Sequence, residues 1–202
     1  MSENGDQLKA QYSENKKITD GNYDQSLAVK CVNGTFVGTK TENVIAYKGI
    51  PFVDKQPVGE LRWKAPVDFT PDDGIYEAYH FARLAVQDLS ITDHQGEDCL
   101  YLNVWQTDDP TAKKPVMVWI HGGAFMAGGT GIELFDCTNL AKEYPDVIFV
   151  TVAYRLGALG FLHLAHLADG KDYPVFIFLR CICWRSVIAL SESTVIGSST
   201  CR

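Results

Sequence analysis

The sequence has no apolar run long enough to cross a membrane. Its most apolar stretch, residues 175–190, is 16 residues long and contains Arg180 and Arg185, whereas a spanning helix needs about 20 apolar residues and rarely tolerates charge. The first 24 residues are polar and of mixed charge, so they lack the basic start and apolar core of an export signal. We therefore expect no membrane partner and a cytoplasmic location.

Basic residues are also scarce. The chain has 202 residues, with 18 Lys and Arg against 25 Asp and Glu, and a formal net charge of -7. An acidic chain without a basic run argues against nucleic acid as a partner. Six cysteines are present, and without an export signal we interpret them as reduced thiols rather than disulfides.

No metal site is predicted. His163 and His166 lie three positions apart, and Cys181 and Cys183 two apart, but a structural zinc site needs four ligands. We expect ordinary histidines and thiols at these positions, and no metal or cofactor.

The remaining composition is that of a globular protein. An apolar fraction of 46% with 21% charged residues excludes wholesale disorder, collagen-like repeats and a coiled coil. The length fits one large domain or two small ones. Residues 1–26 show almost no apolar periodicity, which predicts a flexible leader.

Short apolar runs separated by turn signals predict strands. Asn33-Gly34 between two β-prone runs, residues 27–32 and 35–37, predicts a hairpin. We predict further strands, an extended proline-rich loop and one helix that ends at Pro145; the strands span residues 44–47, 100–105, 116–120 and 147–154, the loop residues 51–74 and the helix residues 132–144. The last two strands are continuous and β-branched, which predicts burial on both faces of a sheet. Strand, glycine loop, helix and strand in this order indicate an α/β fold.

The sharpest local feature is the strand at residues 116–120, which runs directly into His121-Gly122-Gly123-Ala124. A phosphate-binding P-loop would need a Gly-Lys-Ser/Thr ending, which is absent. A dinucleotide fingerprint starts at Gly129 but has Leu134 where its last glycine belongs. Two interpretations stay open: an oxyanion hole, in which small residues let backbone N–H groups face a negative oxygen, and a tight turn that needs glycine only for its conformation.

Four further segments carry a family pattern in the same order along the chain. They are Gly-Ile-Pro-Phe at residues 49–52, the Pro-Val-Gly-Glu-Leu-Arg-Trp run at 57–63, Glu-Asp-Cys-Leu-Tyr-Leu-Asn-Val at 97–104 and Tyr-Arg-Leu-Gly-Ala-Leu-Gly-Phe-Leu at 154–162. Together with the glycine loop, they resemble the type B carboxylesterase family, which includes the cholinesterases. The resemblance extends from about residue 34 to about residue 174.

The resemblance implies an α/β-hydrolase fold and hydrolysis of small-molecule carboxylic esters by a serine nucleophile. It implies that Gly123 and Ala124 supply oxyanion N–H donors, that Gly122 lets the chain turn, and that a third donor follows the nucleophile. It also implies a structural ion pair between Arg62 and Glu97, which as an isolated observation would be two solvated charges. Exported members pair the cysteine at the Cys99 position with an upstream one, but residues 81–87 contain none, which supports a reduced compartment.

The sequence departs from the family where the nucleophile is expected. No G-x-S-x-G elbow occurs in the 202 residues, and the acid and base of a triad would follow it. Residues 175–202 hold three of the six cysteines and a net charge of +2, unlike the rest of the chain.

We therefore predict three segments: the leader at 1–26, the N-terminal part of a carboxylesterase domain with an incomplete central sheet at 27–174, and an unrelated tail, disordered or out of frame, at 175–202. The expected function is that of an ester hydrolase truncated before its nucleophile and inactive as given. The alternatives are a noncatalytic interaction module of the same fold, or a nonfunctional fragment that associates with chaperones.

Overall fold

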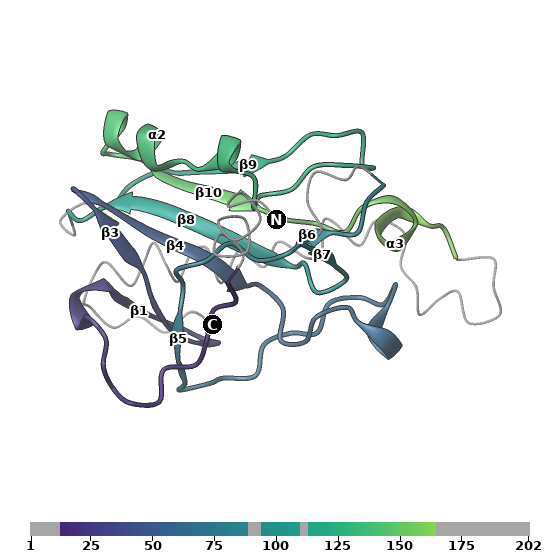
Figure 1. Cartoon of the computed structure of the whole chain (residues 1–202), viewed down its shortest axis with the longest axis horizontal. Helices are drawn as coiled ribbons and strands as arrows, with labels where there is room; N and C mark the ends of the chain where they lie inside the picture. The colour runs from purple at the N-terminus through teal and green to yellow at the C-terminus, as the bar shows by residue number, and fades with distance from the viewer. Residues whose placement is uncertain (1–12, 89–93, 110–112, 165–202) are drawn as a thin grey trace, which may run out of the picture.

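The main sheet holds five strands in the order β3-β4-β8-β10-β9 (Figure 1). The structure is a computed structural model and describes residues 13–88, 94–109 and 113–164. The strands of this sheet are β3 Thr39–Thr41, β4 Val44–Pro51, β8 Tyr101–Thr107, β9 Val116–Ile120 and β10 Ile148–Val152. β4, β8, β9 and β10 confirm predicted strands, although β4 extends four residues and β8 two residues further than expected. β3 was not predicted.

The pairing within this sheet is mixed. β9 and β10 run parallel, in a register that pairs Val116 with Ile148 and Ile120 with Val152, while every other neighbouring pair is antiparallel. Because parallel strands end at the same edge of a sheet, the segments that follow β9 and β10 leave it side by side. The glycine loop and the segment that starts at residue 153 are these two segments.

A smaller sheet covers one face of the main sheet. Its order is β1-β2-β5, from strands Ala28–Cys31, Gly34–Val37 and Ile75–Glu77. β1 and β2 form the hairpin predicted from Asn33-Gly34, and Gly34 takes a φ of 131°. The 3-10 turn η1, Gln25–Leu27, leads into β1.

Residues 16–18 lie along the free side of β5. The Ile18 N–H donates to the Ile75 oxygen at 2.8 Å, and Lys17 pairs with Tyr76. This differs from the flexible leader predicted for residues 1–26. The difference arises because backbone hydrogen bonds make the contact, and these leave no side-chain periodicity in the sequence. Residues 1–12, the tail, His166 and the Cys181 and Cys183 pair lie outside the described residues.

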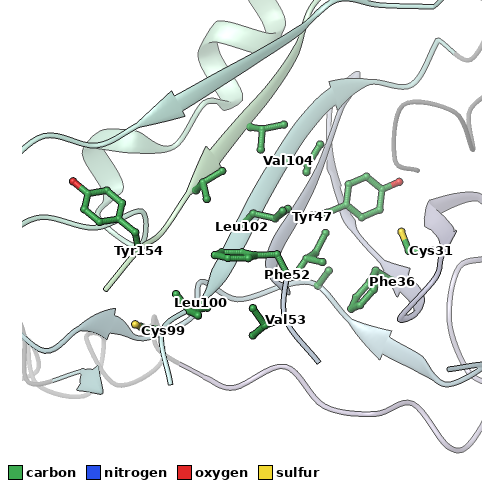
Figure 2. Packing of buried hydrophobic residues seen from close by; sticks show 14 of the residues in the cluster. Cys31, Phe36, Tyr47, Phe52, Val53, Cys99, Leu100, Leu102, Val104 and Tyr154 are labelled. Atoms are coloured by element: carbon green, nitrogen blue, oxygen red, sulfur yellow. The ribbon is translucent and has the colours of Figure 1, made fainter. Parts of the chain in front are cut away.

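The main core fills the space between the two sheets. Figure 2 shows Tyr47 of β4 near Cys31 and Phe36 of the small sheet, with Leu102 and Val104 of β8 further along the same layer. A second cluster lies under α2, the helix Thr138–Glu143, and Trp105 at its centre is fully buried. A helix on one face and a small sheet on the other therefore cover β4 and β8.

Two expectations about this region are wrong in detail. β9 is not buried on both faces: Met117 is 45% exposed and Trp119 is 42% exposed, because within the described residues β9 is an edge strand that pairs with β10 alone. The helix predicted for residues 132–144 is two short pieces, the 3-10 turn η3 at Glu133–Phe135 and α2. Between them, the Asp136 carboxylate accepts the Thr138 N–H at 2.9 Å, a local bond that competes with continuous helix.

The proline-rich loop is as predicted beyond Pro51, where β4 ends. Residues 52–74 contain one 3-10 turn, η2 at Gly59–Leu61, and no strand.

Candidate active site

The glycine loop makes a left-handed turn directly after β9. Gly123, Ala124 and Phe125 have φ values of 117°, 53° and 61°. The Gly123 oxygen accepts the N–H groups of Met126 at 2.9 Å and Ala127 at 3.0 Å, which closes one turn. Its residues from Gly122 to Met126 are exposed, whereas His121 before them and Ala127 after them are buried.

A closed turn of this kind leaves the N–H groups at its start without partners. Within the part of the chain that the structure describes, no hydrogen bond engages the N–H of Gly123 or Ala124. Successive backbone N–H groups in such a turn form a concavity that suits an anion. The loop therefore presents two adjacent donors to solvent.

The turn depends on glycine at position 123. A Cβ there would lie 1.9 Å from the Ala127 oxygen, whereas a Cβ at Gly122 would meet nothing within 4 Å. The need for glycine thus falls at Gly123, one residue after the position to which the resemblance assigns the turn. Ala124 and Phe125 hold left-handed conformations that cost an L-residue about 1–2 kcal/mol each, so surrounding contacts must stabilise them.

His121 fixes the direction of the first donor. Its Nδ1 lies 2.9 Å from the Gly122 oxygen, and because a carbonyl only accepts, Nδ1 is the donor. The Gly122 C=O and the Gly123 N–H point to opposite sides of one planar peptide. Holding the oxygen against the imidazole therefore directs the Gly123 N–H away from His121.

Tyr154 supports this histidine. Its ring stacks on the imidazole with centroids 4.2 Å apart, and its hydroxyl donates to the His121 oxygen at 2.7 Å. His121 is only 3% exposed, and burial lowers its pKa, against an opposing effect of the bond to Gly122. Burial therefore favours the neutral imidazole, and the hydrogen bond to Gly122 calls for a proton on Nδ1.

The exposed side of the turn is attached to α3, Gly157–Phe161. The Gly157 N–H donates to the Phe125 oxygen at 2.8 Å, and the rings of Phe125 and Phe161 lie 4.7 Å apart. Further along the loop, the buried Asn103 amide donates to the Thr130 oxygen at 3.4 Å. The loop is thus held at several points, none of which uses the N–H of Gly123 or Ala124.

Arg62 and Glu97 form a two-bond ion pair beside this region. The Arg62 Nε donates to Glu97 Oε2 at 2.5 Å, and Nη2 donates to Oε1. The hydrogen bonds and charge of Arg62 lower the pKa of Glu97. Next to the pair, the Trp63 indole donates to the Ala158 oxygen at 3.0 Å, so this loop is joined to α3. The ion pair that the resemblance implies is thus formed in the structure, and its structural role stays a prediction.

The roles of Gly123 and Ala124 as oxyanion donors stay a prediction, and the sequence predicted no role for the distant residues that hold this loop in place. Tyr154 and Asn103 fall in family motifs without an assigned role, and Gln87 carries no local signal. Each acts on a loop residue at least 27 positions away in the chain.

Other site chemistry is limited in the part described. No group of three or more His, Cys, Asp or Glu there is placed to hold a metal ion, and no helix there is long and apolar enough for a bilayer.

Comparison with known proteins matches this arrangement to one family. A model of the carboxylesterase family matches residues 25–170. The para-nitrobenzyl esterase of Bacillus subtilis is 43% identical over 139 residues, which are 65% of this chain and 28% of that protein. The acetylcholinesterase of Gallus gallus is 39% identical over 147 residues, or 65% of this chain and 19% of that protein.

Solved structures agree. A PNB esterase structure superposes with a TM-score of 0.74 at 35% identity, and the match covers 83% of this chain and 36% of that one. The chain thus spans about a quarter of the length of the curated relatives and about a third of the solved ones. The chain belongs to the carboxylesterase family and has part of its α/β-hydrolase fold.

Proposed function

We propose that this chain contributes the oxyanion-binding part of an enzyme that hydrolyses small-molecule carboxylic esters. The observation that carries the proposal is the pair of N–H groups at Gly123 and Ala124, which are adjacent, exposed and held on a strained turn. Family membership supplies the reaction class. Neither a noncatalytic interaction role nor a nonfunctional fragment is favoured by a feature of the described residues.

The two donors act on charge that forms during the reaction. When a nucleophile attacks an ester, the carbonyl oxygen becomes an anion, and donors already aimed at that position stabilise it without reorganising. Loss of one such donor costs about 10²–10³ in rate. The anchoring by His121, Tyr154 and Gly157 provides the required rigidity.

The 202 residues lack the G-x-S-x-G elbow, so we propose that serine, acid and base come from polypeptide outside this sequence. The 202-residue chain alone is then inactive, because an oxyanion hole without a nucleophile gives only residual acceleration. Its hydrolysis of p-nitrophenyl acetate should equal the buffer rate and show no burst. Saturable hydrolysis that a serine-directed organophosphate abolishes would overturn this.

A chimera tests the donors themselves. Residues 25–170 would replace the matching stretch of the Bacillus subtilis para-nitrobenzyl esterase, and hydrolysis of a p-nitrobenzyl ester would be measured. We expect an active chimera whose kcat falls about 100-fold or more on Gly123→Val, while Val32→Thr, at an exposed turn position, leaves kcat unchanged. A folded Gly123→Val chimera with full kcat would contradict the proposal.

A further inference from the structure

Gln87 makes a reciprocal pair of hydrogen bonds with one residue of the glycine loop. Its Nε2 donates to the Gly128 oxygen at 2.8 Å, and its Oε1 accepts the Gly128 N–H at 2.9 Å. Both polar groups of Gly128 are thus held by one side chain that lies 41 positions earlier in the chain. Among the described residues, no other side chain holds a residue of the glycine loop at both its N–H and its C=O.

Gln87 is itself held in place. Its backbone N–H donates to the Gln95 Oε1 at 2.9 Å, and its Nε2 also donates to the Ala85 oxygen at 3.1 Å. These contacts attach it to the short parallel pair β6, Leu84–Ala85, and β7, Gln95–Gly96. The side chain therefore connects a fixed pair of strands to the loop.

Gly128 in turn lies directly against the bond that orients the first donor. A Cβ at Gly128 would come within 2.6 Å of His121 Nδ1 and 2.7 Å of the Gly122 oxygen. These are the two atoms whose hydrogen bond directs the Gly123 N–H. The backbone at Gly128 therefore limits where the imidazole and the carbonyl can move.

We infer that Gln87 is a positioning residue for the oxyanion donors, acting through Gly128 on the bond between His121 and Gly122. The purpose of the donors rests on the proposed function. The effect of Gln87 on their orientation rests on geometry alone. We call the two hydrogen bonds between Gln87 and Gly128 the clamp. Without the clamp, the Gly128 backbone shifts and the hydrogen bond between His121 Nδ1 and the Gly122 oxygen weakens. The Gly123 N–H then takes several directions.

The chemistry of the clamp calls for a primary amide of this length. An amide places a donor and an acceptor side by side, which matches the N–H and C=O of a peptide. A carboxylate offers acceptors only, so it would repel the Gly128 oxygen. A protonated carboxyl group again has one donor and one acceptor. Gln87→Glu is therefore a variant whose clamp depends on pH, while Gln87→Met removes both bonds at similar size.

The test uses the 202-residue chain labelled with ¹⁵N. NMR would measure hydrogen exchange at the His121 Nδ1–H and the amide signal of Gly123, with a thermal melt as the check on folding. At pH 7.5 we expect Gln87→Met and Gln87→Glu to exchange the Nδ1–H at least tenfold faster than the unsubstituted chain and to broaden or split the Gly123 signal. Asp88→Asn, at the exposed neighbouring position, should match the unsubstituted chain.

At pH 5 the two variants should separate. Gln87→Glu should return toward the unsubstituted chain at the same pH, because its carboxyl group is protonated in part, and Gln87→Met should not. A purely structural role would lower the melting temperature of both variants without changing the Nδ1–H exchange or the Gly123 signal, and that result would overturn the inference. An inactive chimera with these NMR changes present would instead count against the proposed function alone.

Discussion

β9 and β10 are adjacent, parallel and similarly apolar in sequence, yet their environments differ. All five residues of β10 are buried, whereas β9 has no buried residue. β10 has β8 on one side and β9 on the other, and β9 pairs with β10 alone in the described residues. How much an apolar strand residue contributes to stability therefore depends on the position of its strand in the sheet. The sequence of the strand alone does not reveal this position.

Two tryptophans test this difference most strongly. Trp105 in β8 is 0% exposed, and Trp119 in β9 is 42% exposed. We expect Trp105→Ala to lower the free energy of unfolding by about 3–5 kcal/mol, since it leaves a large cavity, and Trp119→Ala by about 1 kcal/mol or less. Urea unfolding followed by circular dichroism would measure both. Equal losses would remove the distinction between centre and edge.

The next largest loss of stability should follow a substitution at Asn103, a buried polar residue in the centre of the main sheet. The Asn103 Oδ1 accepts the Gly49 N–H at 2.8 Å, and its Nδ2 donates to the Thr151 hydroxyl at 2.9 Å, which links β4, β8 and β10. Asn103→Leu leaves these buried groups without hydrogen-bond partners. We therefore expect the free energy of unfolding to fall by about 1–3 kcal/mol.

The control is Lys113→Met, at an exposed position shortly before β9. It should change the unfolding free energy by less than about 0.5 kcal/mol, as expected for a surface change. A loss there as large as for Asn103→Leu would contradict the comparison.

His121, directly after β9, should make the free energy of unfolding depend on pH. Burial lowers the pKa of His121 in the folded state, so between that pKa and the ordinary value of about 6.5 the unfolded chain binds more protons. The stabilising contribution is complete above about pH 6.5 and is lost as the pH falls through the folded pKa. His121→Asn, which retains a donor near Nδ1, should flatten the unfolding free energy between pH 6.5 and 5.

His94 supplies the matched control for that titration. Its pKa is also lowered, first by burial and then by the charge of Arg83, and it belongs to a different part of the fold. His94→Gln should remove only the part of the pH dependence of the unfolding free energy that is due to His94. If His121→Asn keeps the full slope of the unsubstituted chain, the titration does not originate at the loop.

The smallest change in stability should accompany a charge on the edge strand. Met117 is 45% exposed on β9, and an apolar edge strand invites pairing with other chains. Met117→Lys should alter the unfolding free energy by less than about 0.5 kcal/mol yet reduce aggregation measured by light scattering. Val150→Lys, at a buried position of β10, should instead prevent folding.

Sequence patterns predicted the features that depend on residues adjacent in the chain. The Asn33-Gly34 hairpin, the presence of strands near residues 44, 101, 116 and 148, and the end of α2 before Pro145 follow from turn chemistry and side-chain preference. The exposure of β9 did not, because its apolar run is the same whether or not a second neighbour pairs with it.

The same distinction applies to the candidate site. The glycine loop was noticeable because small residues directly after an apolar strand are a local signal, whereas the roles of Gly123 and Ala124 came from the family resemblance and stay a prediction. The supports from Gln87 and Tyr154 were not noticeable, since each depends on a tertiary contact across more than 30 positions. Local chemistry thus indicates what a loop can donate, and the surrounding fold decides where the donors point.

The left-handed turn has a further consequence, which concerns handedness. At Ala124, with a φ of 53°, the obstacle is the chirality of the Cα atom, since only L-residues clash in this conformation. A D-alanine introduced at this position by chemical ligation would keep the methyl group and adopt the turn without penalty. The mirror-image residue would thus separate the effect of conformational strain from that of side-chain size, which no natural amino acid at this position can do.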